Sequence, residues 1–351
     1  MSETILTLDD VTVRRGSSIV LKNLHLELKQ GQLVLLNGAN GAGKSTIIEV
    51  AAGLLPLESG EVRHHNALLI DASGRSKRAK HAFGLTLQSD GCIGSQRVEE
   101  HLLNAMDLAD GRVDVTPWLE RYNLLHRRHD LVAHLSGGQR RKVAMLAGIL
   151  PGFVGEQAKL ILLDEPGAGL DEASRAKLVE DLHALRKRGH ALLLASHHRD
   201  FIACATDVFN GSEMIPNDVH DSNPLPHHDT KTNGVRKHVL VRTSLALNQR
   251  TLATVASNGI AGFLTLGILL ALVDPTAADS NLIQASGLFL SAAFAAGLVG
   301  DNMISMLHEH RALDWWKAHR QGIPHSYAHG FVLGTGLTAL AQLGFDADRK
   351  S

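Results

Sequence analysis

The sequence of 351 residues predicts an α/β domain followed by an all-α membrane region of about three spans. Short apolar runs alternate with helical-looking segments in the first part, as the buried strands of a parallel sheet do; the clearest runs are residues 33–36, 160–163 and 191–194. Beyond a polar linker lie three uncharged stretches, each about as long as the 20-residue helix that crosses a bilayer: residues 251–273, 280–300 and 326–345.

Composition excludes several classes of protein. The hydrophobic content of 44% supports a folded core, and 35 Lys and Arg against 36 Asp and Glu give a net charge of −1. A nearly neutral chain has no global attraction for nucleic acid, so we expect no nucleic-acid partner. The two cysteines, Cys92 and Cys204, are too few for a disulfide framework and are predicted to be buried thiols in a reducing compartment. The N-terminus lacks a basic segment followed by an apolar run, which predicts that the first half stays in the cytoplasm.

The domain boundaries follow from the changes in composition. We predict a first domain over residues 1–215, a polar linker over 216–236 and a partial transmembrane region over 237–351. Basic residues flank the first two apolar stretches but are missing from the turn between them, so the linker and the 301–325 loop are predicted on the cytoplasmic side. The alternative to membrane spans is a set of buried helices in a second globular domain.

Residues 38–45 fit the phosphate-loop pattern, directly after the apolar run 33–36 and before a predicted helix. Its glycines let backbone N–H groups surround phosphates, and the helix N-terminus adds a positive dipole. Lys44 is expected to reach the β- and γ-phosphates, and the Ser45 hydroxyl to ligate Mg²⁺. The predicted nucleotide contacts come from Asn40, Gly41, Ala42, Gly43, Lys44, Ser45 and Thr46.

A later apolar run ends in two carboxylates, Asp164 and Glu165, where an open α/β sheet places its ligands. Asp164 is predicted to hold the Mg²⁺ shell. Glu165 is predicted to orient or deprotonate the attacking water, since phosphoryl transfer depends on positioning and charge stabilisation. Without the phosphate loop, the same pair would indicate only acids that cap a helix.

The run Leu-Ser-Gly-Gly-Gln at residues 135–139 resembles the signature of ABC-type ATPases. The family's other motifs occur in order: the phosphate loop, Gln88, the acidic pair, Asp171 in Gly-Leu-Asp and His197 in Ala-Ser-His. This resemblance covers about residues 5–210. It implies a P-loop NTPase fold with a helical signature subdomain, ATP hydrolysis, and ATP and Mg²⁺ as cofactors. It also implies a homodimer or heterodimer, because in the family the signature of one domain meets the γ-phosphate bound by the other.

The resemblance also implies roles for single residues. Gln88 should sense the γ-phosphate, take part in the metal site and contact the transport partner, and His197 should hydrogen-bond the γ-phosphate. Arg15 stands where the family usually stacks a tyrosine on adenine, and we predict that its guanidinium stacks on the base instead. Nucleotide contacts are further implied for Ser136, Gly137, Gly138, Gln139 and Asp171.

Residues 306–317, between the second and third apolar stretches, predict a short amphipathic helix at the cytoplasmic face. Trp315 and Trp316 suit an interface or a groove, so we predict that this segment is a coupling helix that docks near Gln88. A plain interfacial helix is the alternative. Residues 309–324 are also similar to the haem exporter of cytochrome c maturation, of whose usual six spans three are present. The chain is then either a truncated fusion or a half-permease completed by another subunit.

The predicted function is therefore ATP-driven export by a protein of the cell membrane whose ATPase domain is cytoplasmic, with haem as a candidate substrate. Two alternatives stay open: an exporter of another substrate, such as a drug or a lipid, and an ABC ATPase switch without a role in transport.

Overall fold

The structure is a computed structural model that describes residues 2–39, 41–77, 79–107, 109, 111–217 and 311–318. The chain divides into two compact units, the first formed by Met1–Arg236 with Glu309–Gln321 and the second by Lys237–His308 with Gly322–Ser351. All described residues belong to the first unit. The three predicted membrane stretches and residues 218–236 of the predicted linker lie outside the described residues. Of the helices in the described part, none combines the length and apolar character needed to cross a bilayer.

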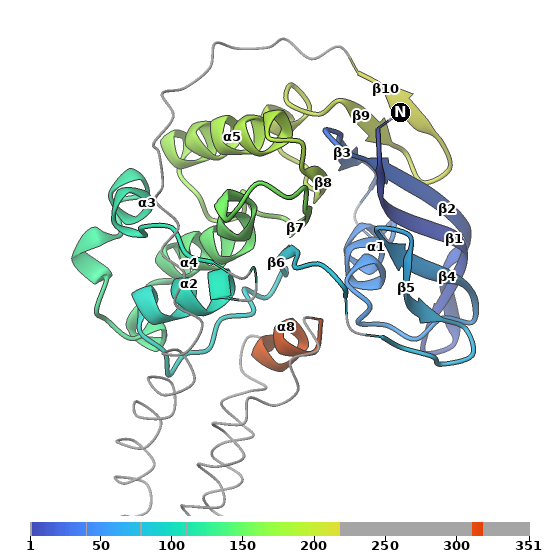
Figure 1. Cartoon of the computed structure of the whole chain (residues 1–351), viewed down its shortest axis with the longest axis horizontal. Coiled ribbons are helices and arrows are strands. Elements are labelled where there is room, and N and C mark those ends of the chain that lie inside the picture. The colour runs from blue at the N-terminus through green and yellow to red at the C-terminus, as the bar shows by residue number, and fades with distance from the viewer. Residues whose placement is uncertain are drawn as a thin grey trace, which may run out of the picture. The chain divides into compact units, whose positions relative to one another are not determined.

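An antiparallel sheet forms one side of the first unit, in the strand order β2-β1-β4-β5 (Figure 1). Its strands are β1 (Thr4–Arg15), β2 (Ser18–Lys29), β4 (Ser59–His64) and β5 (Ala67–Asp71). In the second half of β2, buried Leu24, Leu26 and Leu28 alternate with exposed polar residues. A period of two marks a sheet with one face on the core and the other in water.

The second sheet has six strands in the order β10-β9-β3-β8-β7-β6. These are β3 (Leu33–Leu36), β6 (Gly84–Thr86), β7 (Leu160–Asp164), β8 (Ala191–Ala195), β9 (Asp207–Phe209) and β10 (Met214–Pro216). All pairs are parallel except β9 with β10. Every residue of β3, β7 and β8 is buried, which confirms that the three apolar runs are parallel strands covered on both faces.

The register of the parallel strands brings three predicted motifs to one edge of the sheet. Ala195, the last residue of β8, pairs with Leu36 of β3 on one side and with Asp164 of β7 on the other. The loops that follow these strands carry the phosphate loop, Glu165 and His197. Because the carboxyl ends of parallel strands lie together, these motifs meet although more than a hundred residues separate the first from the others.

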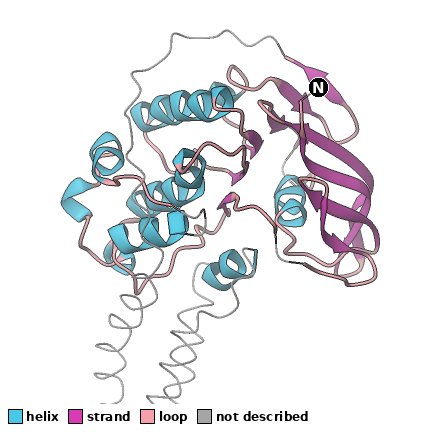
Figure 2. Cartoon of the chain, in the orientation of Figure 1, coloured by secondary structure: helices cyan, strands magenta, loops and turns pink. Residues whose placement is uncertain are grey.

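Some helices flank the second sheet, and others form a separate group at the end far from the antiparallel sheet (Figures 1 and 2). The helices are α1 (Lys44–Ala51), α2 (Val98–Asp107), α3 (Thr116–Arg121), α4 (Gly137–Ile149) and α5 (Glu172–Lys187). Single 3₁₀ turns span Leu125–Arg127, Val132–His134, Leu150–Phe153 and Arg199–Phe201. Helices α2, α3 and α4 form the helical group, so the signature lies on it as the resemblance implied.

Helix α4 packs against β6 with almost no space between the two backbones. A Cβ atom on Gly84 would lie 1.9 Å from the carbonyl oxygen of Gly148, and one on Gly148 would lie 2.0 Å from Oγ1 of Thr86. Only glycine fits at either position, and this close approach fixes α4 relative to the sheet edge that carries the motifs.

Both cysteines are free and buried, as predicted. Burial raises the pKa of the Cys204 thiol to about 12, so this thiol stays protonated and unreactive at neutral pH.

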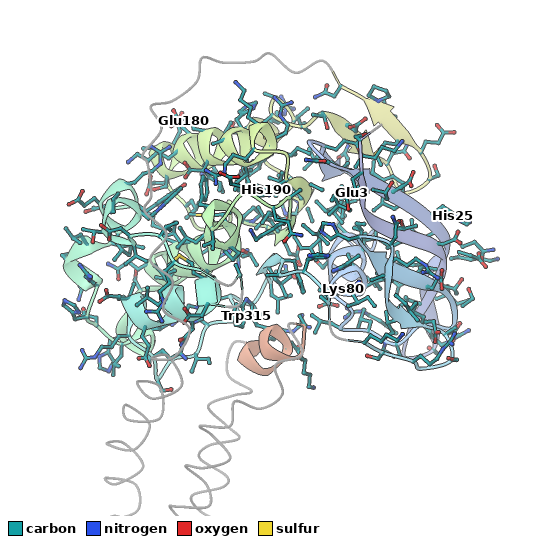
Figure 3. The ribbon with its side chains drawn as sticks, in the orientation of Figure 1. Glu3, His25, Lys80, Glu180, His190 and Trp315 are labelled. Carbon is teal, nitrogen blue, oxygen red and sulfur yellow. The ribbon has the colours of Figure 1, made fainter. Side chains whose placement is uncertain are left out.

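His190, at the turn between α5 and β8, makes the stability of the fold depend on pH (Figure 3). Its Nδ1 accepts a hydrogen bond from the backbone N–H of Lys159 at 2.9 Å, which requires an unprotonated nitrogen. Burial lowers the pKa of His190 to about 4, whereas histidine in an unfolded chain titrates near pH 6.5. Between these values the unfolded state binds more protons, so the stabilising contribution of His190 is present at neutral pH and is lost as the pH falls toward 4.

We expect His190→Asn, whose side-chain oxygen can accept the same hydrogen bond without titrating, to weaken the loss of stability on acidification. The difference in unfolding free energy between wild type and variant should change by on the order of 1–3 kcal/mol between neutral pH and about pH 4.5. Denaturant unfolding at the two pH values measures it. A parallel loss of stability in both proteins would contradict the assignment.

Helix α8 (Ala312–Ala318) is the one element described beyond residue 217. It overlaps the predicted coupling segment 306–317 from Ala312 onward and ends one residue past it. The helix belongs to the first unit, together with β6 and α4.

Candidate functional site

The phosphate loop joins β3 to α1 in the conformation that its glycines predict. Gly38, Gly41 and Gly43 have φ values of 152°, 83° and 86°, in the region that favours glycine. Nζ of Lys44 donates hydrogen bonds to the carbonyl oxygens of Gly38 and Ala39, at 2.7 and 3.0 Å. The lysine thus closes the loop into an arc at the N-terminus of α1, which is a favourable place for anionic phosphate.

The other predicted residues of the loop differ in exposure. Gly41 and Ala42 are exposed, Ser45 is half-buried and Thr46 is buried at the start of α1. Asn40 lies outside the described residues.

Ser45 and Asp164 lie together as the metal prediction requires. Oγ of Ser45 donates a hydrogen bond to Oδ1 of Asp164 at 3.1 Å, across 119 positions of the sequence. Asp164 is buried, and this burial raises the pKa of its carboxyl group. A hydroxyl and a carboxylate are the hard oxygen donors that Mg²⁺ prefers, and a divalent cation would offset the cost of the buried negative charge. The two side chains therefore fit a Mg²⁺ ion.

Glu165 follows β7 in an unusual backbone conformation. Its φ is +49°, which is uncommon for a residue with a side chain and is typical of a functional position held by its surroundings. Its backbone N–H donates to the carbonyl of Ala195 at 2.8 Å. Oε1 lies 3.1 Å from Nε2 of His197, and Oε2 accepts from Oγ of Ser196 at 3.4 Å.

The carboxylate of Glu165 is buried, but the His197 ring is 57% exposed. The pair thus joins a fixed carboxylate to an accessible imidazole at the edge where the phosphate loop begins. A carboxylate held by a histidine in this way can orient a water molecule and accept its proton. The neighbouring His198 is half-buried and packs edge-on to Phe201 at 6.3 Å between ring centroids.

The signature residues form the N-terminus of α4. Oγ of Ser136 accepts from the backbone N–H of Gln139 at 3.3 Å, and Oε1 of Gln139 accepts from the backbone N–H of Ser136 at 3.0 Å. This reciprocal capping box satisfies two N–H groups of the first turn. Ser136 and Gly137 are exposed, and Gly138 is half-buried. The helix N-terminus is therefore turned toward solvent, where it is accessible to a second molecule.

Asp171 caps helix α5. Its carboxylate accepts hydrogen bonds from the backbone N–H and hydroxyl of Ser174, at 2.8 and 3.0 Å, and pairs with Lys142 of α4 at 3.0 Å. The hydrogen bond from Lys142 and those from Ser174 lower the pKa of Asp171. The structure thus gives this predicted nucleotide contact a capping role within the chain.

Arg15 has a protein partner that the sequence analysis did not foresee. Its guanidinium pairs with the carboxylate of Glu49, on α1, which is only 2% exposed. The other oxygen of Glu49 pairs with Arg311, just before α8. The positive charges of the two arginines therefore compensate the negative charge of the one buried carboxylate. No local pattern shows this, because the three residues lie far apart in the sequence.

Gln88 is exposed and follows β6 in the segment Leu85–Gly91. The backbone of this segment is held by Arg141 of α4, whose Nη1 donates to the carbonyls of Leu87 and Gln88 at 2.6 and 3.3 Å. No motif in the sequence assigns a role to Arg141. It lies two positions after the signature glutamine, but the sequence does not tell which arginine of the pair 140–141 is buried.

Helix α8 docks on the same Leu85–Gly91 segment. Trp315 is 3% exposed, and its Nε1 donates to the carbonyl of Leu85 at 3.0 Å. Its indole covers Gly91, where an added Cβ would lie 3.2 Å from Cβ of Trp315. The ring of His101, on α2, lies 6.0 Å from it between centroids, and burial lowers the pKa of His101 to about 4. A neutral slot between β6 and α2 thus holds the tryptophan.

Comparison with known proteins identifies the family. The family model described as ABC transporter matches residues 21–168. The nucleoside import ATP-binding protein NupA of Lactococcus lactis subsp. cremoris is 30% identical over 214 residues, which cover 59% of this chain and 41% of NupA. The chain therefore spans less than half the length of that relative.

The zinc import ATP-binding protein ZnuC of Photorhabdus laumondii subsp. laumondii is 30% identical over 205 residues, which cover 58% of this chain and 73% of ZnuC. A solved structure described as an ATP binding subunit of an ABC transporter is 24% identical and covers 60% of this chain and 88% of that chain, with a TM-score of 0.48. The match to ZnuC covers most of the length of ZnuC. This chain therefore carries an ABC ATPase domain and belongs to the ABC transporter family as an ATP-binding protein.

Proposed function

We propose that this chain couples the hydrolysis of ATP to transport across a membrane, with residues 1–215 as the ATPase and residues 237–351 as a partial permease. The observation that carries this proposal is the docking of α8, a segment from the apolar C-terminal part of the sequence, on the Leu85–Gly91 segment that leads from the sheet to Gln88. Such a contact is a physical route by which movement of the C-terminal part can change the nucleotide site.

Within the ATPase, the phosphate loop binds the triphosphate. Lys44 exchanges its carbonyl partners for the β- and γ-phosphates, and the N–H groups from Gly41 to Thr46, with Asn40, surround the phosphate oxygens. Ser45 and Asp164, with Gln88, supply the oxygen ligands of Mg²⁺, which neutralises charge on the phosphates when it is bound.

Glu165 acts as the base that orients the attacking water, and His197 stabilises the carboxylate and hydrogen-bonds the γ-phosphate. Their contact at 3.1 Å and the burial of Glu165 support this division of roles. Arg15 contacts the base through the exposed part of its guanidinium, while the same guanidinium keeps its ion pair with the buried Glu49.

The functional unit is a dimer, either of two copies or of this chain with a homologous partner. The capping box leaves Ser136, Gly137 and Gly138 at an exposed helix N-terminus, which suits a γ-phosphate presented by a second ATPase domain. Asp171 contacts the same partner in this proposal, and its ion pair with Lys142 of α4, which links it to the signature helix, supports this role.

Export is the proposed direction, and haem is one candidate substrate because residues 309–324 are similar to a haem exporter. A drug or a lipid is the alternative cargo. The names of NupA and ZnuC refer to import of nucleosides and of zinc by those proteins. Stimulation of ATP hydrolysis by haem, but not by nucleosides or zinc, in vesicles that contain the full chain would support the haem assignment.

The test of coupling is Trp315→Ala in the full chain. Removing the indole leaves the Leu85 carbonyl without its donor and a cavity over Gly91, so α8 should leave the segment. We expect kcat for ATP hydrolysis in isolated membranes to fall about five- to tenfold, with an unchanged affinity for ATP.

The matched control is Lys317→Ala, on the exposed side of the same helix. It should change kcat by less than about threefold. Equal rates for wild type and Trp315→Ala would contradict coupling through α8, and a full chain that stays in the supernatant after membranes are pelleted would contradict the transporter function.

A further inference from the structure

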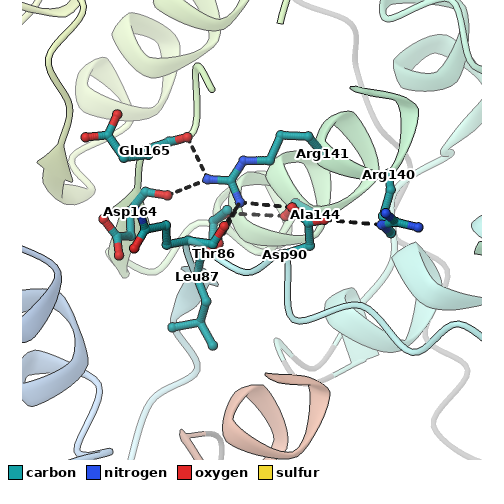
Figure 4. Close-up of polar contacts among 9 residues, drawn as sticks. Thr86, Leu87, Asp90, Arg140, Arg141, Ala144, Asp164 and Glu165 are labelled. Carbon is teal, nitrogen blue, oxygen red and sulfur yellow. Dashed lines mark hydrogen bonds and ion pairs between the residues drawn. The ribbon is translucent and has the colours of Figure 1, made fainter. Parts of the chain in front are cut away.

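The buried guanidinium of Arg141 contacts both the chain segment that carries Gln88 and the chain segment that carries Asp164 and Glu165 (Figure 4). Nη1 donates to the carbonyl oxygens of Leu87 at 2.6 Å and Gln88 at 3.3 Å. Nη2 donates to the carbonyl oxygens of Asp164 at 2.5 Å and Glu165 at 2.6 Å. One side chain from the signature helix thus joins the Leu85–Gly91 segment to the backbone of Asp164 and Glu165.

Among the described residues, the carboxylate that forms an ion pair with Arg141 is that of Asp90. Oδ1 of Asp90 lies 3.2 Å from Nη1, while Oδ2 pairs with the neighbouring Arg140 at 3.3 Å. A buried cation needs a charged partner and hydrogen-bond acceptors, and only the planar fork of arginine reaches four carbonyls in two directions. Nη1 and Nη2 of Arg141 have such acceptors, whereas its Nε has no hydrogen-bond partner among the described residues. Lysine has one nitrogen with three hydrogens, so it can keep the charge but not this set of contacts.

The contacts of Nη2 bear on the conformation of Glu165. In an extended strand, successive carbonyl groups point to opposite sides. At Glu165 the strand ends with φ at +49°, and the carbonyls of Asp164 and Glu165 both face Nη2. A positive φ is costly for glutamate, and the two hydrogen bonds from Arg141 favour it over an extended conformation.

The contacts of Nη1 bear on α8. Arg141 holds the Leu85–Gly91 segment at its centre, and Trp315 holds it at Leu85 and Gly91. The path from Trp315 to the backbone of Glu165 therefore runs through one segment of chain and one guanidinium. A shift of the segment on movement of α8 would be passed to Glu165 through this side chain, whose atoms cannot move independently.

We propose that Arg141 is a positioning residue that holds the backbone of Glu165 in its catalytic conformation and passes the docking state of α8 to it. This inference rests on the roles proposed above for Glu165 and α8. It adds a physical link between them that neither the motifs nor the comparisons assign. A buried arginine that only stabilises the fold would contribute to stability without affecting turnover separately.

The test compares ATP hydrolysis by the full chain as wild type, Arg141→Lys and Arg140→Gln. Arg141→Lys keeps the buried charge, and we expect kcat to fall about 10- to 100-fold because Glu165 is misplaced. The Kd for ATP, measured with Mg²⁺ in the absence of turnover, should change less than about threefold, since Lys44 and its loop are untouched. Arg140→Gln loses a contact to the same Asp90 but none to the carbonyls, and its kcat should stay within about threefold of wild type.

A double-mutant cycle with Trp315→Ala separates positioning from stability. In wild type this change should lower kcat about five- to tenfold, and in the Arg141→Lys background by less than about twofold, because the link is already broken. Wild-type kcat in Arg141→Lys, a parallel fall of ATP affinity and kcat, or effects of the two substitutions that multiply would each overturn the proposal. Failure of wild type itself to hydrolyse ATP would instead overturn the proposed function.

Discussion

Replacing Glu165 with Gln is expected to lower kcat for ATP hydrolysis by at least about 100-fold while ATP still binds. The amide keeps the size of the side chain and its hydrogen bond to Ser196, but it cannot accept a proton from water. The phosphate loop, Ser45 and Asp164 are unchanged, so the variant should retain nucleotide and accumulate in the ATP-bound dimer. Release of phosphate and size-exclusion chromatography with Mg²⁺ and ATP measure the two effects.

The control for this change is Glu213→Gln, at an exposed position between β9 and β10. Its kcat should lie within about threefold of wild type. Hydrolysis by Glu165→Gln at the rate of the control would assign the base elsewhere. A variant that is inactive but remains a monomer with ATP would leave the base in place and contradict the dimer.

Replacing Lys44 with Ala is expected to raise the Kd for ATP about 10- to 100-fold and to abolish ATP-dependent pairing. Charge-assisted hydrogen bonds to the β- and γ-phosphates are lost, and so are the two hydrogen bonds from Nζ that close the loop onto Gly38 and Ala39. Binding of a fluorescent ATP analogue to the full chain measures the change. The effect on Kd separates this variant from Glu165→Gln, which should bind ATP normally.

Lys29→Ala serves as the matched control, since Lys29 is an exposed lysine at the C-terminal end of β2, whereas the part of β2 that packs on Gly43 is Val20 and Leu21. It should change the Kd less than about threefold. An unchanged Kd in Lys44→Ala would mean that the triphosphate does not bind at the N-terminus of α1. It would also contradict the Mg²⁺ site proposed at Ser45 and Asp164, which depends on a triphosphate bound there.

Several features could be predicted from the sequence because each depends on a short run of residues. The three fully buried strands are continuous apolar runs, and their β-pairing follows from burial on both faces. The phosphate loop is encoded by Gly38, Gly41 and Gly43, each of which takes a positive φ that other residues disfavour. The capping box of Ser136 and Gln139 spans only four positions.

The contacts between the motifs were less predictable. The position of Asp164 next to Ser45 could be expected from the rule that carboxyl ends of parallel strands meet, but the positive φ of Glu165 could not. Nothing in the residues Asp-Glu-Pro requires it. The conformation depends on Ala195 and Arg141, which lie on other elements.

The sequence by itself determined three strands of the parallel sheet, the phosphate loop and the signature turn, since local hydrophobic pattern and backbone preference suffice for these. The class of chemistry followed from the order of the motifs. Only the tertiary structure decided that Arg141 is buried between two segments, that Glu49 pairs with Arg15 and Arg311, and that Trp315 occupies the slot at Leu85 and Gly91. Those side chains meet across as many as 262 positions, and which of many arginines fills a buried position depends on the packing of elements distant in the chain.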